Sequence, residues 1–95
     1  MKIYKYILEL TTSQSIDIIG FEKVLDCQVQ NGKICIWVLC DPLPARQANC
    51  PNPVKGQNFW IFGTGQDIDV DYMDILYLKT VQLDGYVWHV FKSIL

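Results

Sequence analysis

The sequence predicts an all-β fold, arranged as a small antiparallel sandwich or a partly open barrel of six or so strands. The first observation is a pair of turn signals, Asn31-Gly32 and Asp84-Gly85, each flanked by apolar runs. Both residues of such a dipeptide tolerate the positive φ of a type I′ turn, so each should close a two-residue hairpin. The second observation is the alternation of side chains from Ile3 to Leu10, which has the period of a strand.

The composition fits one domain covering residues 1–95, because a chain of this length can bury one modest core. Hydrophobic residues make up 51% of the chain and charged residues 19%, which leaves more apolar surface than one core readily covers. A homo-oligomer is therefore expected. The net charge of −2 provides no electrostatic footprint for nucleic acid, so no nucleic-acid partner is expected.

The N-terminal segment MKIYKYILEL has a short apolar run interrupted by charges, with no small-residue cleavage site behind it. No export signal is therefore expected. No run approaches the roughly 20 apolar residues that cross a bilayer. These features predict a soluble protein of the cytoplasm without membrane contact. The cysteines match no zinc pattern and are expected to be free thiols in a reducing compartment: Cys27, Cys35, Cys40 and Cys50.

Strands are expected in sequence along the first forty residues. The first runs from Ile3 to Leu10 and is followed by a polar turn, Thr11 to Ser15. Ile16 to Ile19 then form a short second strand that ends at a glycine. The first hairpin, Val24 to Leu39, ends before Asp41-Pro42, because proline lacks the N–H that a strand ladder needs.

The two-residue turn fixes the register of the first hairpin, with Val29 opposite Ile34 and Asp26 opposite Trp37. Its mixed face includes Gln28 and Trp37, and this face either meets solvent or holds a partner. Its apolar face should be buried, and consists of Leu25, Cys27, Val29, Ile34, Ile36 and Val38.

Residues 42–58 are rich in proline and asparagine, so a loop is expected there. A loop of this length is either a mobile excursion, which we favour, or a contact loop. Phe59 to Phe62 should form a short aromatic strand that leads into Gly63-Thr64-Gly65. We interpret these three residues as a tight turn. The alternative is that their N–H groups bind an anion, although the lysine of a P-loop is missing.

The acidic segment DIDVDYMD, residues 67–74, lacks the glycine and glutamate positions of an EF-hand, so no metal site is expected. One helical turn near Val70 to Ile75 is expected instead. Asp69 or Asp71 should accept hydrogen bonds from the free N–H groups at its start, and Tyr72 or Ile75 should pack inward.

The second hairpin spans Leu78 to Phe91, and its register follows from the Asp84-Gly85 turn. The face expected in the core contains Lys79, Val81, Leu83, Tyr86, Trp88 and Val90. The mixed polar and aromatic face contains Leu78, Thr80, Gln82, Val87, His89 and Phe91.

Four blocks of sequence stand out: QVQNG at 28–32, CIWVLCDP at 35–42, FGTG at 62–65 and TVQLDGYVWHVFK at 80–92. In this order, and over nearly the whole chain, they resemble a family of small, largely uncharacterised proteins encoded by bacteriophages and prophages. The resemblance implies a phage origin and a common fold, and it transfers no catalytic residue. Members of that family usually carry His-Pro after the Gly-Thr-Gly turn, where this chain has Gln66-Asp67.

No catalytic set can be assembled from a nucleophile with a base, from paired carboxylates or from a metal cluster. The protein is therefore expected not to be an enzyme and to need no cofactor. The resemblance implies a small accessory protein of the host cytoplasm that binds and inhibits a host factor, for example one of a defence system. Two alternatives stay open: a sponge that sequesters a nucleotide signal, and a minor structural protein of the virion.

The candidate binding residues come from three parts of the chain. If the two hairpins lie in one sheet, or face each other across subunits, their mixed faces converge on one neutral patch with an aromatic anchor. The glycine-flanked threonine turn supplies a further ligand contact. The full set is Gln28, Trp37, Gly63, Thr64, Gly65, Thr80, Gln82 and His89.

Overall fold

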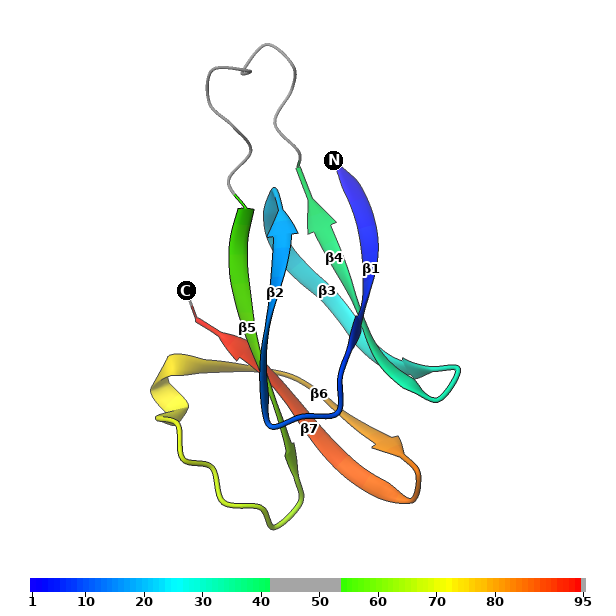
Figure 1. Ribbon diagram of the computed structural model, residues 1–95, viewed down its shortest axis with the longest axis vertical. Helices are drawn as coiled ribbons and strands as arrows, with labels where there is room; N and C mark the ends of the chain where they lie inside the picture. Colours follow the sequence, from blue (N-terminus) through cyan, green and yellow to red (C-terminus); the bar gives the residue numbers. More distant parts are fainter. Residues whose placement is uncertain (42–53, 95) are drawn as a thin grey trace.

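The computed structural model describes residues 1–41 and 54–94. Within these ranges the regular structure consists of strands and one 3-10 turn, so the prediction of an all-β protein is confirmed (Figure 1). The elements are β1 (Lys2–Leu8), β2 (Ser13–Ile19), β3 (Phe21–Gln30), β4 (Lys33–Cys40), β5 (Val54–Gly63), η2 (Tyr72–Asp74), β6 (Ile75–Leu83) and β7 (Tyr86–Ser93).

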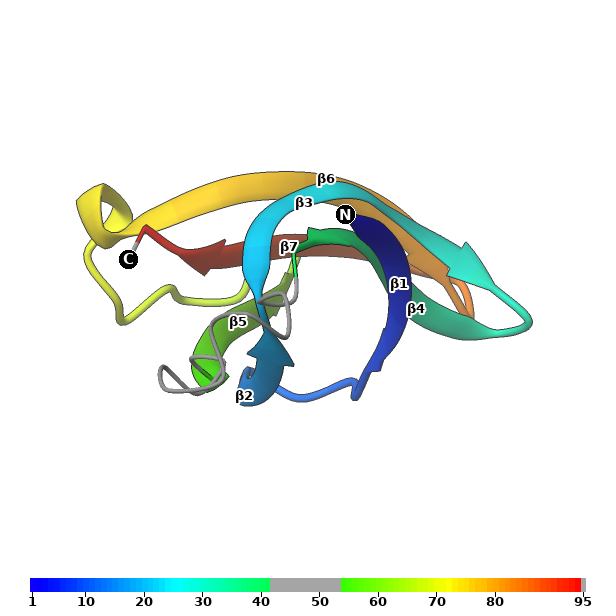
Figure 2. The same cartoon turned by 90° about the horizontal axis from the view of Figure 1, so that it is seen from above.

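The strands form two antiparallel sheets packed around a common interior. One sheet has the order β1-β4-β3 and the other the order β2-β5-β7-β6. Figure 2 shows both sheets curving around this interior, with β3 beside β6. An ion pair of 3.1 Å between Asp26 Oδ1 on β3 and Lys79 Nζ on β6 joins these two edges. The two sheets pack against each other, as in the predicted sandwich, and they do not close into a barrel.

Both hairpins have the predicted two-residue turns. Asn31 and Gly32 have φ values of 53° and 73°, and Asp84 and Gly85 have φ values of 54° and 80°. These positive angles are those of type I′ turns, and they set the predicted register on both sides of each turn.

Leu25 does not face the core as predicted, because a β-bulge interrupts the first hairpin. Val24 pairs with Val38 and Asp26 with Trp37, so Leu25 is an extra residue between two consecutive pairs. Leu25 is 44% exposed, and Val24 packs against the core in its place. The other five residues predicted on this face are buried or packed against the core: Cys27, Val29, Ile34, Ile36 and Val38.

A second bulge changes the predicted faces of the last hairpin. The pairing steps from Tyr77 opposite Phe91 to Lys79 opposite Val90, which leaves Leu78 as the extra residue. Leu78 therefore packs against the core instead of lying on the mixed face. Beyond the bulge, Thr80 lies opposite His89 as predicted.

Three predicted element boundaries are wrong. β1 ends at Leu8 rather than Leu10, and β2 begins at Ser13 inside the predicted turn. β5 begins at Val54, so residues 54–58 belong to a strand instead of the predicted loop, whose part 42–53 lies outside the described residues. The boundaries of β2 and β5 have a shared cause, because the longer β2 pairs with β5 along its whole length, from Ser13 opposite Trp60 to Ile19 opposite Val54.

The predicted helical turn is the 3-10 turn η2. The Asp71 side chain caps it by accepting a hydrogen bond from Met73 N, as expected for this aspartate. Ile75 is buried next to the turn, whereas Tyr72 is exposed.

The core lies between the two sheets. It contains Leu8, Cys27, Ile34, Ile36, Val38 and Cys40 from the first sheet and Ile18, Phe59, Ile61, Val81 and Val90 from the second. Three predicted free thiols are observed, and all three are buried: Cys27, Cys35 and Cys40. Cys50 lies outside the described residues. Burial, together with the nearby Asp26 carboxylate, raises the pKa of the Cys27 thiol to about 12.

Candidate functional site

The outer face of the three-stranded sheet carries an apolar surface with Trp37 at its centre. Trp37 on β4 lies opposite Lys5 on β1 and Asp26 on β3. Because side chains alternate along a strand, this face points away from the core residues Ile36 and Val38. We call this surface the Trp37 face; it consists of Ile3, Lys5, Ile7, Cys35, Trp37 and Leu39.

Large apolar side chains on the Trp37 face are open to solvent. Ile3 is 60% exposed and Ile7 is 52% exposed, and both lie on β1. Lys5, between them, extends across the sheet to β3, where its Nζ donates a 2.8 Å hydrogen bond to Gln30 Oε1. In the part of the chain that the structure describes, β1 pairs only with β4 and is an edge strand. The Trp37 face therefore combines exposed apolar side chains with an open strand edge.

Asp26 lies at the margin of the Trp37 face and is held by three groups. It accepts hydrogen bonds from Cys27 N at 2.8 Å, from Gln28 Nε2 at 2.6 Å and from Lys79 Nζ at 3.1 Å. These bonds, that of the Cys27 N–H above all, hold the pKa of the Asp26 carboxyl below its ordinary value. The candidate residue Gln28 thus positions a carboxylate beside Trp37.

His89 lies on the outer face of the four-stranded sheet and is hydrogen-bonded through both ring nitrogens. Its Nε2 is 2.8 Å from Thr64 Oγ1, and its Nδ1 is 2.9 Å from Thr80 Oγ1. The Thr80 hydroxyl also lies 2.7 Å from the Tyr77 hydroxyl. Among the described residues, the group that orients the His89 ring through Nδ1 is the neutral Thr80 hydroxyl, whereas a hydrolase triad uses a carboxylate at this position.

Sequence reasoning did not identify Tyr77 as part of this cluster. The bulge at Leu78 places Tyr77 opposite Phe91, and the two rings meet edge to face with their centroids 5.7 Å apart. Phe91 meets Phe62 in the same way at 5.9 Å. The available signal was that the predicted alternation put apolar Leu78 on the mixed face, and the bulge returns Leu78 to the core side. Lys79 keeps its predicted position opposite Val90, and its ammonium group reaches Asp26 on β3.

Gly63-Thr64-Gly65 forms a tight turn, which confirms the interpretation that we favoured. Gln66 N donates to Gly63 O at 3.0 Å, and Gly65 has a φ of 88°. Gly63 N donates to Gln66 Oε1 and Thr64 N donates to Val87 O. Three N–H groups of the turn, those of Gly63, Thr64 and Gln66, are therefore bonded within the protein and are not free donors for a phosphate, while the anion alternative itself stays a prediction.

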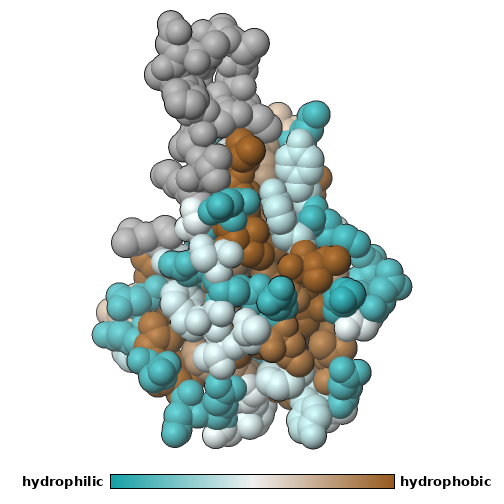
Figure 3. Space-filling model, viewed as in Figure 1, coloured by the Kyte–Doolittle hydropathy of each residue, from teal (hydrophilic) through white to brown (hydrophobic). Residues whose placement is uncertain are grey.

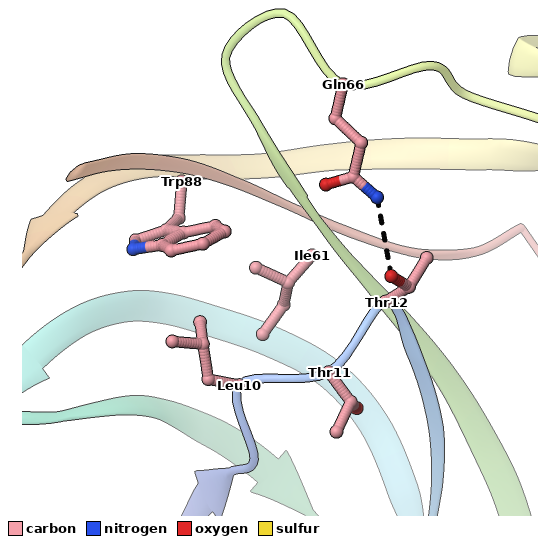
Figure 4. Close-up of a pocket in the computed structure, with 6 residues that line it drawn as sticks. All are labelled: Leu10, Thr11, Thr12, Ile61, Gln66 and Trp88. Carbon is pink, nitrogen blue, oxygen red and sulfur yellow. Dashed lines mark hydrogen bonds between the residues drawn. The ribbon is translucent and has the colours of Figure 1, made fainter.

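A pocket of about 340 Å³ lies beside this turn. Figure 4 shows its lining side chains, which come from the β1–β2 connection, from β5 and β7, and from the turn itself. They are Leu10, Thr11, Thr12, Ile61, Gln66 and Trp88. The sequence did not indicate this pocket, because Thr12 and Gln66 are 54 positions apart and meet only in the folded chain.

The predicted single patch does not form within one chain. Trp37 and Gln28 belong to the three-stranded sheet and His89 and Thr80 to the four-stranded sheet, on faces that both point away from the core. Of the two arrangements that would bring the residues together, the one with both hairpins in one sheet is wrong, because β4 pairs with β1 while β7 pairs with β5. The arrangement across two facing subunits stays a prediction. The structure therefore joins Thr64, Thr80 and His89. Gln82 is exposed and lies two residues beyond Thr80 on the same strand.

The acidic residues between Asp67 and Asp74 are exposed. Over residues 1–41 and 54–94, His, Cys, Asp and Glu side chains do not gather in threes around a point where a metal ion would fit. Over the same ranges, no helix has the length and apolar character needed to cross a membrane.

The fold and these surfaces define a small two-sheet β protein. The chain belongs to the family described as a domain of unknown function (DUF7352), whose model matches residues 1–94. Comparisons with curated proteins and with solved structures found no match.

Proposed function

We propose that this chain is a phage-encoded, non-enzymatic binding protein that acts in the host cytoplasm by covering a surface of a host protein, and that it thereby inhibits a defence component. The observation that carries the proposal is the Trp37 face. Its central tryptophan is surrounded by Ile3, Ile7 and Leu39, which are at least partly open to solvent.

Such a surface has the composition of a protein contact. Aromatic anchors, tryptophan above all, contribute most of the binding energy in many interfaces, and exposed apolar side chains around them exclude water. Two charged side chains, Lys5 and Asp26, lie on either side of Trp37, and both are already hydrogen-bonded within the chain. Two further lysines, Lys23 opposite Leu39 and Lys33 at the hairpin end, are exposed at the rim of the same side of the sheet. The partner is therefore expected to present an apolar surface opposite Trp37, with charge only at the rim of the contact.

The expected homo-oligomer is part of the proposal. Fourteen large apolar or aromatic side chains are exposed among the described residues, more than the Trp37 face contains. Figure 3 shows apolar side chains reaching the surface between polar ones in the middle of the view. A second group lies around η2, and consists of Tyr72, Met73, Leu76 and Ile94. This group supports a contact between copies that leaves the Trp37 face free.

The test uses the tagged chain as bait in infected cells and identifies the captured host protein by mass spectrometry. The captured protein is then purified and its affinity is measured by calorimetry. The informative variant carries Ile3→Asp and Ile7→Asp, which place two carboxylates on the Trp37 face. The matched control is Leu76→Asp on the other sheet, where Leu76 is 48% exposed, against 52% for Ile7.

We expect the double variant to lose the partner while Leu76→Asp retains it, with both variants melting as the parent does. Sedimentation of the same proteins separates self-association from partner binding, because Leu76→Asp should reduce assembly alone. Equal binding by the double variant and the parent would refute the assignment of the Trp37 face. Recovery of the chain with purified virions, and with no host protein, would favour the virion alternative.

A further inference from the structure

The pocket beside the Gly63-Thr64-Gly65 turn lies apart from the Trp37 face, at an open end of the sandwich. Its walls are the connection from β1 to β2, the inner faces of β5 and β7, and the turn. In Figure 4 Trp88, Ile61 and Leu10 gather on one side, and Gln66 and Thr12 lie on the other. At about 340 Å³ it is large enough for a small ring system, since ligand pockets begin near about 300 Å³.

The apolar wall is held in a fixed position. Trp88 Nε1 donates a 3.4 Å hydrogen bond to Leu83 O, and the Tyr86 ring lies 6.0 Å from the indole. Gly63 packs against the six-membered ring of Trp88, where a Cβ would come within 3.3 Å of Cζ3. A flat indole fixed in this way is a ready surface for stacking by another flat ring.

The polar wall presents a donor and an acceptor side by side. Gln66 Oε1 accepts from Gly63 N at 3.0 Å, and Gln66 Nε2 donates to Thr12 Oγ1 at 3.3 Å. Each amide atom retains capacity for one further bond, because Nε2 has a second hydrogen and Oε1 a second lone pair. The bond from Gly63 N also fixes which amide atom is the oxygen, so the order of donor and acceptor is set by the backbone.

From this geometry we propose that the pocket binds a nucleobase. The base stacks on Trp88, and an edge of the base that carries a donor next to an acceptor pairs with the Gln66 amide. Adenine and uracil both have such an edge. The six lining residues include no charged side chain, so the pocket recognises the base and makes no ion pair with a phosphate. Free nucleosides and nucleotides are thus equivalent ligands for this site.

The test is a titration of the ¹⁵N-labelled protein with adenosine and uridine, followed by NMR through the Trp88 indole N–H and the Gln66 side-chain amide. The same titration with adenosine and uridine monophosphates separates nucleoside from nucleotide recognition. Gln66→Ala removes the amide, and Trp88→Leu removes the stacking surface. The controls are Gln82→Ala, at an exposed glutamine that does not line the pocket, and Trp60→Phe, at a tryptophan of the opposite face of β5.

We expect saturable shifts of the Trp88 and Gln66 signals, with affinities for nucleoside and monophosphate within about twofold of each other. Gln66→Ala should weaken binding at least fivefold while keeping the dispersed spectrum of the parent, and the controls should bind as the parent does. If Trp88→Leu does not fold, Gln66→Ala alone decides. Absence of saturable shifts at millimolar nucleoside, or equal shifts in Gln66→Ala, would overturn the proposal. Because Trp37 is not part of this pocket, Trp37→Ala should bind nucleoside normally, which keeps this test separate from that of the proposed function.

Discussion

Thr64 and His89 are joined by a hydrogen bond of 2.8 Å between Oγ1 and Nε2, although they lie 25 positions apart in the chain. This bond ties the turn after β5 to the middle of β7. Replacement of Thr64 by valine keeps the shape and removes the hydroxyl, and the expected loss of unfolding free energy is about 1 kcal/mol, as for a typical hydrogen bond. Urea denaturation measures it. In a double-mutant cycle with His89→Gln the two losses should not add, and strict additivity would show that the bond contributes nothing to stability.

The bulge at Leu25 predicts different losses of stability when Leu25 and Ile36 are replaced by alanine. Without the bulge, the alternation of side chains along the strands would put both on the core face. Ile36 is fully buried, and Ile36→Ala should cost roughly 2–5 kcal/mol of unfolding free energy. Leu25→Ala removes a side chain that is 44% exposed and should cost less than about 1 kcal/mol. Chemical denaturation of both variants gives the comparison. Similar losses in the two would mean that Leu25 is buried and that the bulge is absent.

The Cys27 thiol should be inert in the folded protein. With its pKa raised to about 12, roughly one molecule in ten thousand carries the reactive thiolate at pH 8. Iodoacetamide should therefore leave Cys27 unmodified under native conditions and label it in urea, as read by peptide mass spectrometry. Native labelling of Cys27 at the rate found in urea would contradict its position in the core.

Lys92 provides a pH-dependent test of packing. Its side chain is 7% exposed on the core side of β7, with Nζ 5.1 Å from the centre of the Phe21 ring. Nζ also donates to the Ser93 carbonyl, and burial lowers the pKa of the ammonium group. Below that lowered pKa the folded state carries a buried charge. Between the lowered and the ordinary pKa the unfolded state binds more protons, so stability rises with pH there.

Lys92→Met removes the buried ammonium group and with it this dependence of stability on pH. The stability of the variant relative to the parent should therefore be highest at pH 7 and fall as the pH approaches 10. Urea titrations at several pH values measure the difference, with Lys33→Met at the exposed hairpin turn as the control. A difference that does not change with pH would show that Lys92 is solvated in the folded protein.

Local features of the sequence predicted much of the fold. Asn31-Gly32 and Asp84-Gly85 determine two turns and the register next to them, because few residues tolerate φ values above 50° at these positions. The bulges were not predicted, since Val24 and Leu25 are both apolar and alternation alone does not show which one is the extra residue. The boundaries of β2 and β5 depend on pairing between distant segments, which neither segment indicates by itself.

The prediction of the candidate site depended on which sheet each hairpin joins, and this was the feature of the fold that the sequence indicated least. Thr64, Thr80 and His89 came together because β6, β7 and the turn after β5 are neighbours. Trp37 was separated from them because β4 pairs with β1. The position of Tyr77 depends on a bulge, and the pocket around Trp88 depends on a contact between distant residues. Neither feature could be predicted from the sequence.

The most direct test of the proposed function is the affinity of the captured host protein for Trp37→Ala and for His89→Ala. We predict that Trp37→Ala weakens binding by at least about 1 kcal/mol, the level that separates important interface residues from bystanders. His89→Ala, on the other sheet, should bind as the parent does. Thermal melts and sedimentation of both variants confirm that each remains folded and assembled. Unchanged affinity of a folded Trp37→Ala, or an equal loss in both variants, would contradict the assignment of the Trp37 face as the binding surface.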